Sequence, residues 1–386
     1  MARMRFGAFI APHHPVGEHP TLQFERDLQL IEHLDQLGYD EVWVGEHHSG
    51  GWETIGHPEM FLAAAAQRTH RIKLATGVVS LPYHHPYNTA GRIAMLDHLS
   101  RGRAILGTGP GALPSDARTF GIDPVVLRDR QDEALDAIMP LLHSPDPVTL
   151  KTDWYDLNEG YLQVRPVQEK LEVVAAVSIS PSGMKLAGKH GLSVISVASY
   201  SEEGLQALPT QWSWAETYAE EYGTQISRDN WRVMMPFHLA ETRQQAFDEI
   251  YDGLLHWHNG YNVDVLARPG AERVEDPKGF AHKMVDRGGA IIGTPDDAVE
   301  AIARLSELAG GFGTLVGFVH DWANHEQAMR SYDLFARYVI PRIQGLLTPV
   351  QRSADMLRAN NTELMKQAGA GIMKAIREHN AAHPRA

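Results

Sequence analysis

The stretch Glu41-Val42-Trp43-Val44-Gly45-Glu46-His47-His48 decides how the chain folds and where its chemistry lies. Residues 42–45 predict a short buried strand that ends at a glycine and is followed at once by a carboxylate and two imidazoles. Ligands of parallel barrels and sheets bind at the carboxyl ends of the strands. Because free histidine has a pKa of about 6.5, Glu46, His47 and His48 are predicted catalytic groups for proton transfer. An isolated His-His pair would instead favour two polar loop residues, or one core histidine bonded to a backbone carbonyl; the strand before the pair and the repeats after it favour the catalytic interpretation.

The pattern around this stretch repeats along the chain, because apolar segments of strand length alternate with amphipathic segments of helix length. Strands are predicted at residues 4–11, 42–45, 72–81, 104–108, 171–177, 193–197, 231–239 and 314–319. Helices are predicted at 21–37, 57–66, 87–99, 128–142, 182–190, 205–222, 242–257, 294–308 and 324–339. Near-continuous apolar strands between helices indicate a parallel sheet that is covered on both faces. The α/β class is therefore predicted as a (β/α)8 TIM barrel, with a doubly wound sheet as the alternative.

Three segments fall outside the repeat. Residues 154–164 predict an antiparallel hairpin that turns at Asn158-Glu159-Gly160. Residues 259–290, after the seventh strand's helix, are rich in glycine, proline and charge, and predict an insertion that covers the barrel mouth as a mobile lid. Residues 346–386 predict a polar helical extension, packed on the outside or on a partner chain, which leaves residues 1–345 as one barrel domain.

Composition excludes several classes of protein. The net charge of -13 over 386 residues is unlike the footprint of a nucleic-acid-binding protein. The absence of cysteine excludes disulfides, Cys-bound zinc, iron–sulfur clusters and a thiol nucleophile. The N-terminus lacks a signal-length apolar core, and no apolar run is long enough to span a bilayer. A cytoplasmic protein without membrane contact is expected.

Polar side chains recur after the first four predicted strands, which predicts a shared site at one rim of the barrel. They are His13 and His14, then Glu46, His47 and His48, then Tyr83, His84 and His85, then Thr108, Ser115 and Asp116. Neighbouring residues on an extended segment point to opposite sides. Adjacent histidines therefore rarely hold one metal ion, so no metal ligand is predicted and a metal hydrolase is a weaker alternative.

Two further motifs each leave two interpretations open. Gly107-Thr108-Gly109-Pro110-Gly111-Ala112 matches the loose dinucleotide pattern, but no helix is predicted until about residue 128. Its glycines either let a flat ligand approach the backbone or form a turn. The second motif, Ser178-Ile179-Ser180-Pro181-Ser182-Gly183, opens a helix, and a helix N-terminus favours an anion. Ser180 and Ser182 with Arg128 or Arg130 would suit a phosphate, or the segment is a plain helix cap.

Together these motifs make the chain, over about residues 4–345, resemble the bacterial luciferase-like family of flavin-dependent monooxygenases, most of all its limonene 1,2-monooxygenase branch. The resemblance is carried by Met4-Arg5-Phe6-Gly7, Gly38 to His48, Thr76-Gly77-Val78-Val79-Ser80-Leu81-Pro82 with His85-Pro86, Leu96 to Arg103, Phe120-Gly121 and Ala187 to Gly191. The family implies a TIM barrel that forms a homodimer. It also implies a reduced flavin, FMN or FAD, at the carboxyl ends of the strands, supplied by an NAD(P)H-dependent flavin reductase.

The resemblance also assigns residues. His47 matches the catalytic histidine, Gly77-Val78 the cis peptide beneath the isoalloxazine, and Asp116 an acidic residue near the flavin. The phosphate contacts fall on Arg128, Ser180 and Gly183. Luciferases have Cys-Arg where this chain has Gly109-Pro110. The phosphate contacts are therefore redistributed here, and the missing cysteine argues against light emission.

The resulting hypothesis is a monooxygenase that uses reduced flavin and O2, through a flavin C4a-hydroperoxide, to oxygenate a small apolar substrate such as a terpene or cyclic ketone. Its apolar pocket would be lined by Trp43, Trp52, Phe9 and Tyr83, although each of these aromatics taken singly fits plain core better. The alternatives are a deazaflavin (F420)-dependent oxidoreductase that transfers hydride, and a non-catalytic flavin-binding protein.

Overall fold

The computed structural model describes residues 3–11, 13–268 and 270–383. The chain separates into two units, residues 1–340 and 341–386, which are described in turn.

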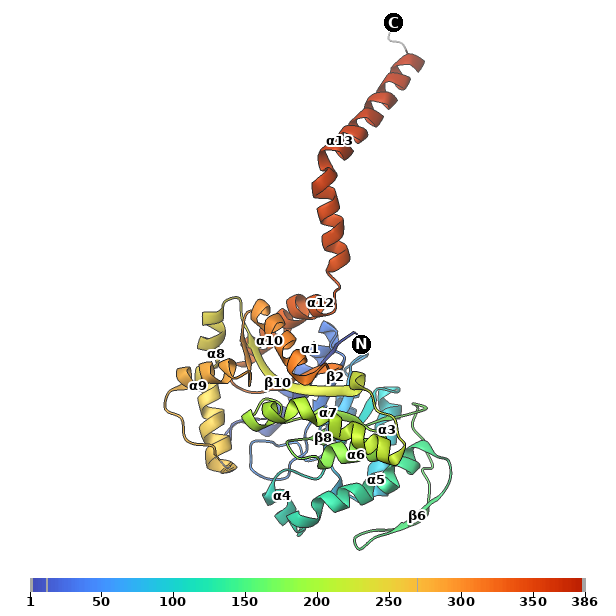
Figure 1. Ribbon diagram of the computed structural model, residues 1–386, viewed down its shortest axis with the longest axis vertical. Helices are drawn as coiled ribbons and strands as arrows, with labels where there is room; N and C mark the ends of the chain where they lie inside the picture. Colours follow the sequence, from blue (N-terminus) through green and yellow to red (C-terminus); the bar gives the residue numbers. More distant parts are fainter. Residues whose placement is uncertain (1–2, 12, 269, 384–386) are drawn as a thin grey trace. The chain divides into compact units, whose positions relative to one another are not determined.

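Eight parallel strands of the first unit close into a barrel, which confirms the predicted fold and rules out the doubly wound sheet (Figure 1). The strands are β1 (Arg5–Ile10), β2 (Glu41–Val44), β3 (Lys73–Thr76), β5 (Ala104–Gly109), β8 (Glu172–Val177), β9 (Ser193–Ser196), β10 (Trp231–Leu239) and β12 (Thr314–Val319). Each pairs with the next, and β12 returns to β1. In register, Ile10 pairs with Val44, and Val44 pairs with Thr76. The loops after β1, β2 and β3 therefore leave the barrel at the same rim.

Helices surround the strands. They are α1 (Pro20–Leu37), α2 (Pro58–Ala66), α3 (Pro86–Ser100), α4 (Pro114–Thr119), α5 (Leu127–His143), α6 (Ser182–His190), α7 (Glu202–Tyr222), α8 (Arg243–His256), α9 (Pro277–Asp286), α10 (Pro295–Ala309) and α11 (His325–Leu334). Helix α1 shows why the pattern works. It buries Leu28, Ile31 and Leu34 on one face, and Gly38 ends it with a φ of 85°. Glycine reaches this left-handed conformation without steric cost.

A buried ion pair lies inside the barrel, near the amino-terminal ends of its strands. Arg232 of β10 is fully buried, with Nε 2.8 Å from Glu41 Oε1 and Nη1 2.9 Å from Glu172 Oε1. Trp43 is also fully buried, and its indole N–H donates to Glu41. Trp43 is therefore core rather than pocket lining, and Phe9, 7% exposed, belongs to the same hydrophobic cluster.

Some predicted elements are wrong in detail. The hairpin is β6 (Val148–Lys151) with β7 (Asp156–Gly160), and it turns at residues 152–155 instead of 158–160. Helix α4 begins at Pro114, soon after the glycine motif, where no helix was expected before residue 128. Proline at the first helical turn costs no hydrogen bond, so Pro114 starts a helix rather than delaying one.

The segment predicted as a lid carries secondary structure. Its first part continues α8 as a π-helix, η4 (Trp257–Val265), and its second part contains α9. Strand β11 (Ile291–Gly293) then pairs with β10 outside the ring. Shorter elements complete this unit: β4 (Val79–Ser80), the 3-10 turns η1 (Leu81–Tyr83), η2 (Pro124–Val126) and η3 (Arg228–Asn230), and the π-helix η5 (Phe335–Val339). Helix α12 (Ile340–Ile343) follows η5.

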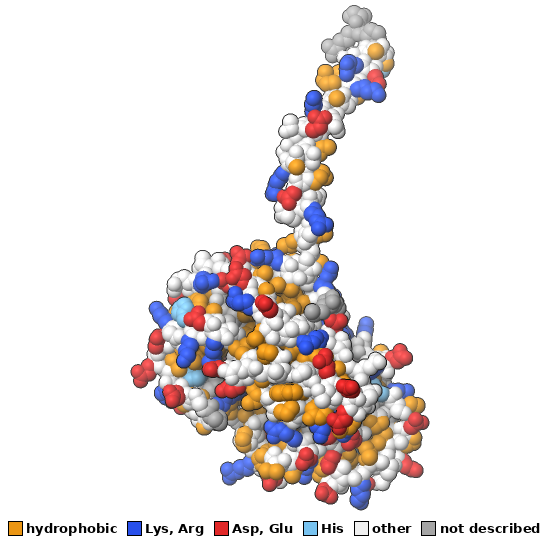
Figure 2. Space-filling model, viewed as in Figure 1, with side chains coloured by type: hydrophobic (Ala, Val, Ile, Leu, Met, Phe, Trp, Pro, Cys, Tyr) orange, Lys and Arg blue, Asp and Glu red, His pale blue; other side chains and the backbone are white. Residues whose placement is uncertain are grey.

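The second unit is dominated by α13 (Thr348–Ala382), a helix with no buried side chain. Val350, Leu357, Leu364 and Ile372 are exposed and recur at helical spacing. Apolar and charged side chains can both be seen along this segment in Figure 2. Among the described residues, no helix combines the length and the apolar character that crossing a lipid bilayer requires.

Candidate active site

The segment after β2 divides its side chains between two polar clusters. Gly45 still belongs to the barrel edge, because its N–H donates to Ile10 O, and His47 N–H donates to Ile55 O. The His47 ring faces Asp116 and Glu53, while Glu46 and His48 face each other. The adjacent histidines therefore have different partners, as their spacing predicts.

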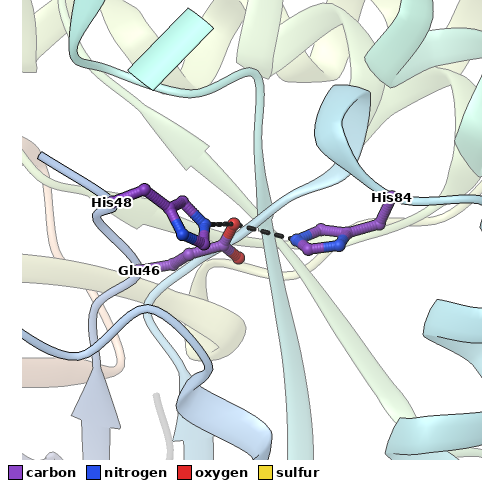
Figure 3. Close-up of side chains that lie close together, drawn as sticks. All are labelled: Glu46, His48 and His84. Carbon is purple, nitrogen blue, oxygen red and sulfur yellow. Dashed lines mark hydrogen bonds and ion pairs between the residues drawn. The ribbon is translucent and has the colours of Figure 1, made fainter. Parts of the chain in front are cut away.

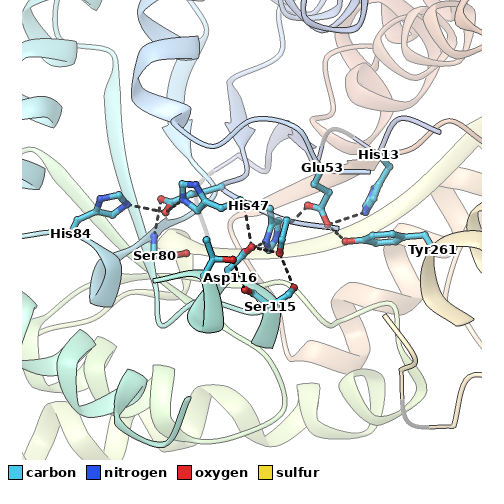
Figure 4. Close-up of polar contacts among 12 residues, drawn as sticks. His13, His47, Glu53, Ser80, His84, Ser115, Asp116 and Tyr261 are labelled. Atoms are coloured by element: carbon cyan, nitrogen blue, oxygen red, sulfur yellow. Dashed lines mark hydrogen bonds and ion pairs between the residues drawn. The ribbon is translucent and has the colours of Figure 1, made fainter. Parts of the chain in front are cut away.

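His47 lies between two carboxylates (Figure 4). Its Nδ1 is 3.0 Å from Asp116 Oδ2, and its Nε2 is 3.3 Å from Glu53 Oε2. Asp116 is buried in α4, where its Oδ1 accepts hydrogen bonds from His48 N–H and from the Ser49 hydroxyl. Burial alone would lower the pKa of His47, but the charges of Glu53 and Asp116 raise it above its ordinary value. The ring is therefore a candidate proton donor near neutral pH.

Glu46 lies between two imidazoles (Figure 3). Its Oε1 is 3.0 Å from His48 Nε2 and 2.9 Å from His84 Nε2, while its Oε2 accepts the Ser80 N–H at 3.0 Å. Burial would raise the pKa of Glu46, yet the hydrogen bonds from His48 and His84 lower it to about 2. Glu46 thus stays ionised and orients both rings.

The same three groups have a spacing that a metal ion could use. In the structure, however, both imidazoles are hydrogen-bonded to Glu46. Histidines that bind a metal almost always donate their second ring N–H to a further group. No such partner is found for the Nδ1 of His48 or His84 among the described residues. We assign no metal here.

The strand ends next to Glu46 are packed tightly together. Gly77-Val78 is a cis peptide, as the resemblance implies. A Cβ on Gly109 would lie 2.5 Å from Val78 Cγ2, and one on Gly107 would lie 2.0 Å from Thr76 O. Gly107 and Gly109 therefore belong to β5 and are required by strand packing, not by a turn. The Thr108 hydroxyl donates to Val174 O inside the barrel wall.

The end of β8 carries the predicted anion site. Ser180 Oγ and Ser182 Oγ are 2.9 Å apart at the start of α6, and no side chain in the described part of the chain caps this helix. A Cβ on Gly183 would meet Ala176 O at 2.7 Å, so glycine lets the helix start against the strand. The N–H groups at the start of a helix, together with two hydroxyls, are a donor set that fits a phosphate.

The predicted phosphate site also includes Arg128 or Arg130. Arg128 is exposed on α5 and has no hydrogen bond to either serine in the described part of the chain. Arg130 lies over the Trp154 ring, with its guanidinium carbon 5.2 Å from the ring centroid.

The structure thus joins Glu46, His47, His48 and Asp116 in one network, while Ser180 and Ser182 stand at a separate strand end. A cavity of about 530 Å³ lies between α1 and α11, lined in part by Arg26, Asp321 and His320. None of the predicted site residues lines it, so the site is assigned from its chemistry.

Sequence reasoning missed Glu53 and Tyr261. Glu53 is buried, and its carboxylate lies beside the His47 ring. Tyr261 donates its phenol O–H to the same carboxylate. The only signal in the sequence is that Glu53 follows Trp52 directly, just after the pair Gly50-Gly51. Tyr261 could not be paired with it, because 208 residues separate the two.

Known proteins are similar to this chain over most of its length. A family model described as luciferase-like monooxygenase matches residues 4–311. A 4-hydroxyprotoasukamycin monooxygenase of Streptomyces nodosus subsp. asukaensis is 46% identical over 356 residues, which are 92% of this chain and 96% of that protein. A limonene 1,2-monooxygenase of Rhodococcus erythropolis is 44% identical over 376 residues, 97% of this chain and 95% of that protein.

A solved structure shares the fold as well. The oxygenating constituent of 3,6-diketocamphane monooxygenase from Pseudomonas putida, a type II Baeyer–Villiger monooxygenase in complex with FMN, superposes with a TM-score of 0.73. It is 27% identical, and the match covers 88% of this chain and 98% of that chain. The chain therefore belongs to the luciferase-like monooxygenase family, as a flavin-dependent monooxygenase built on a (β/α)8 barrel.

Proposed function

We propose that this protein uses reduced FMN and O2 to place one oxygen atom on a small apolar substrate, a terpene or a cyclic ketone. The observation that carries the proposal is His47, held between Asp116 and Glu53 at the carboxyl end of β2. The relatives support it, because one acts on limonene by name and the aligned structure with bound FMN is a diketocamphane monooxygenase.

The residues present fit a flavin. Ser180, Ser182 and the start of α6, with Gly183, would hold its phosphate, and we keep Arg128 as their proposed cationic partner. Gly77, Val78, Thr108 and Gly109 would form the floor under the isoalloxazine. When bound, reduced flavin supplies the activation of oxygen, which no side chain can supply.

The side chains have separate tasks in this proposal. The ring nitrogen of His47 that faces Glu53 holds a proton at the site, and Asp116 fixes the orientation of the ring. Glu46 keeps His48 and His84 in place. Tyr83 and Phe120 stack with ring centroids 4.8 Å apart beside His48, and would offer an apolar wall to the substrate.

The direct test supplies reduced FMN from a generic flavin reductase and follows oxygen uptake and products over a panel of terpenes and cyclic ketones. We expect oxygenated products that depend on the chain and on O2. Oxygen uptake with hydrogen peroxide as the only product would contradict the proposal and favour a non-catalytic flavin-binding protein.

Anaerobic titrations with reduced FMN, reduced FAD and reduced deazaflavin test the cofactor. We expect FMN to bind most tightly, and preferential binding of deazaflavin would favour a hydride-transferring oxidoreductase. We also propose a homodimer served by a separate NAD(P)H-dependent flavin reductase. Light scattering would measure the mass of the proposed homodimer. Turnover with and without an added reductase would show whether a separate reductase is needed.

A further inference from the structure

Glu53 is a buried carboxylate that three side chains approach from different elements. Its Oε2 is 3.3 Å from His47 Nε2, and its Oε1 is 3.5 Å from His13 Nε2. Tyr261 of η4 donates its phenol O–H to the same Oε1. The backbone of Glu53 is also fixed, because residues 13 and 53 form an antiparallel bridge. The carboxylate therefore has little freedom to turn away from His47.

The two carboxylates around His47 decide how many protons the ring carries. A neutral imidazole has one N–H and one lone pair, so it can donate to only one carboxylate. With Asp116 alone, His47 would donate from Nδ1 and leave Nε2 as a base. Glu53 places a second negative charge 3.3 Å from Nε2 as an ion pair, and this charge favours the imidazolium, which carries a proton on both ring nitrogens.

We propose that Glu53 is a positioning residue that keeps His47 as an imidazolium, with its second proton on Nε2, and that Tyr261 fastens Glu53 to the inserted segment. This inference rests on the proposed function for its catalytic meaning, because it makes His47 an acid rather than a base in the oxygenation. The protonation state itself can be measured without flavin or substrate.

Other groups around His47 are consistent with this state. The charges that face it are Asp116 from α4, Glu53, and Glu46 on its own segment, while His48 is the nearest further imidazole. Burial would raise the pKa of Glu53, but the charges of His47 and His13 and the hydrogen bond from Tyr261 hold it below its ordinary value. Glu53 is therefore ionised when it meets the ring.

The segment that contains η4 packs against the loop that carries Trp52 and Glu53. Tyr261 and His256 lie beside the Trp52 ring, with centroids 5.5 and 5.2 Å away. A Cβ on Gly260 would lie 2.9 Å from Trp52 Cζ2, so the π-helix approaches the indole as closely as glycine allows. The contact between Tyr261 and Glu53 thus links the segment after β10 to the proton on His47.

The first experiment records the 15N signals of the histidine rings in the wild-type protein without flavin, with His47 assigned by comparison with His47→Gln. We expect both ring nitrogens of His47 to carry protons at pH 7.5. A His47 ring with an unprotonated Nε2 at that pH overturns the proposal, and this result needs no variant of Glu53.

The second experiment repeats the titration in Glu53→Gln, which keeps the shape of the side chain and removes its charge. We expect the pKa of His47 to fall by about one unit, a tenfold change in its protonation equilibrium. The control is Glu59→Gln, another buried glutamate, which pairs with Arg92 on the outside of the barrel. An equal titration of His47 in the wild type and Glu53→Gln contradicts the proposal.

Tyr261→Phe tests the link to the insertion. We expect faster amide hydrogen exchange in residues 257–265, measured by mass spectrometry, with exchange in α3 unchanged. Unchanged exchange in 257–265 would remove Tyr261 from the proposal. Failure of wild-type turnover with reduced FMN, with His47 still doubly protonated, would refute the proposed function and leave this inference standing.

Discussion

Arg232 Nε lies 2.8 Å from Glu41 Oε1 across the interior of the barrel, and its Nη2 lies 2.9 Å from Glu41 Oε2. The guanidinium is fully buried, also pairs with Glu172, and lies over the ring of Trp43. Glu41 pairs with this one cation, and Glu172 shares it with Lys73, whose Nζ lies 3.8 Å from Glu172 Oε2. Burial would raise the pKa of Glu172, but the charge and hydrogen bond of Arg232 hold it at about 2.

Arg232→Met should destabilise the protein by about 3–5 kcal/mol, because it leaves the buried Glu41 carboxylate without its counter-ion. Urea unfolding followed by circular dichroism measures the free energy. Arg304→Met, on the exposed face of α10, is the control and should change stability little. Equal stability of the two variants would show that water or protonation compensates the buried pair.

His47→Ala should retain flavin binding and lose about 100-fold or more in product formation, because it removes the proton donor. Asp116→Asn should also lower product formation, since the His47 ring loses the carboxylate that accepts from Nδ1 and fixes its orientation. Steady-state turnover with supplied reduced FMN measures both. Unchanged turnover in His47→Ala would refute the assigned role.

Replacing Ser180 and Ser182 together by alanine should weaken the binding of FMN by about tenfold and leave the binding of riboflavin unchanged. Only FMN carries the phosphate that the hydroxyls would bind. Fluorescence titration with both ligands gives the ratio, and Ser213→Ala on α7 is the control. Parallel losses for FMN and riboflavin would place the phosphate elsewhere.

Stability should fall as the pH rises from about 6.5 to 9, because of His14. Burial would lower the pKa of His14, but its hydrogen bonds to Asp27 and Asp321 raise it to about 9. A folded-state pKa above the unfolded value stabilises the fold fully below pH 6.5, and this contribution is lost through pH 9. Thermal unfolding across this pH range measures the fall in stability. In His14→Asn this fall should be smaller. A melting temperature with no such dependence would contradict the pairing.

We propose that residues 1–345 fold without the C-terminal extension. No side chain of α13 is buried, and residues 1–340 form a compact unit by themselves. A chain ending at Gly345 should keep the melting temperature of the full chain within about 2 °C, measured by calorimetry. A clear drop would show that residues 346–386 stabilise the barrel.

The sequence by itself determined the barrel, because strand and helix periodicities are local and each segment carries its own pattern of buried faces. It also placed Glu46, His47 and His48 at a strand end, and strand ends of a parallel barrel share one rim. Alternation along the extended segment was enough to assign the two histidines to different sides.

Only the tertiary structure decided which carboxylates meet His47. Asp116 and Glu53 come from a short helix and from a loop, and the phenol that fastens Glu53 comes from the insertion more than 200 residues further along the chain. The tertiary structure also assigned Trp43 to the core and Gly107 and Gly109 to strand packing. These choices depend on which atoms approach in space, and a linear pattern of residue types holds no information on distances between segments that are far apart in the chain.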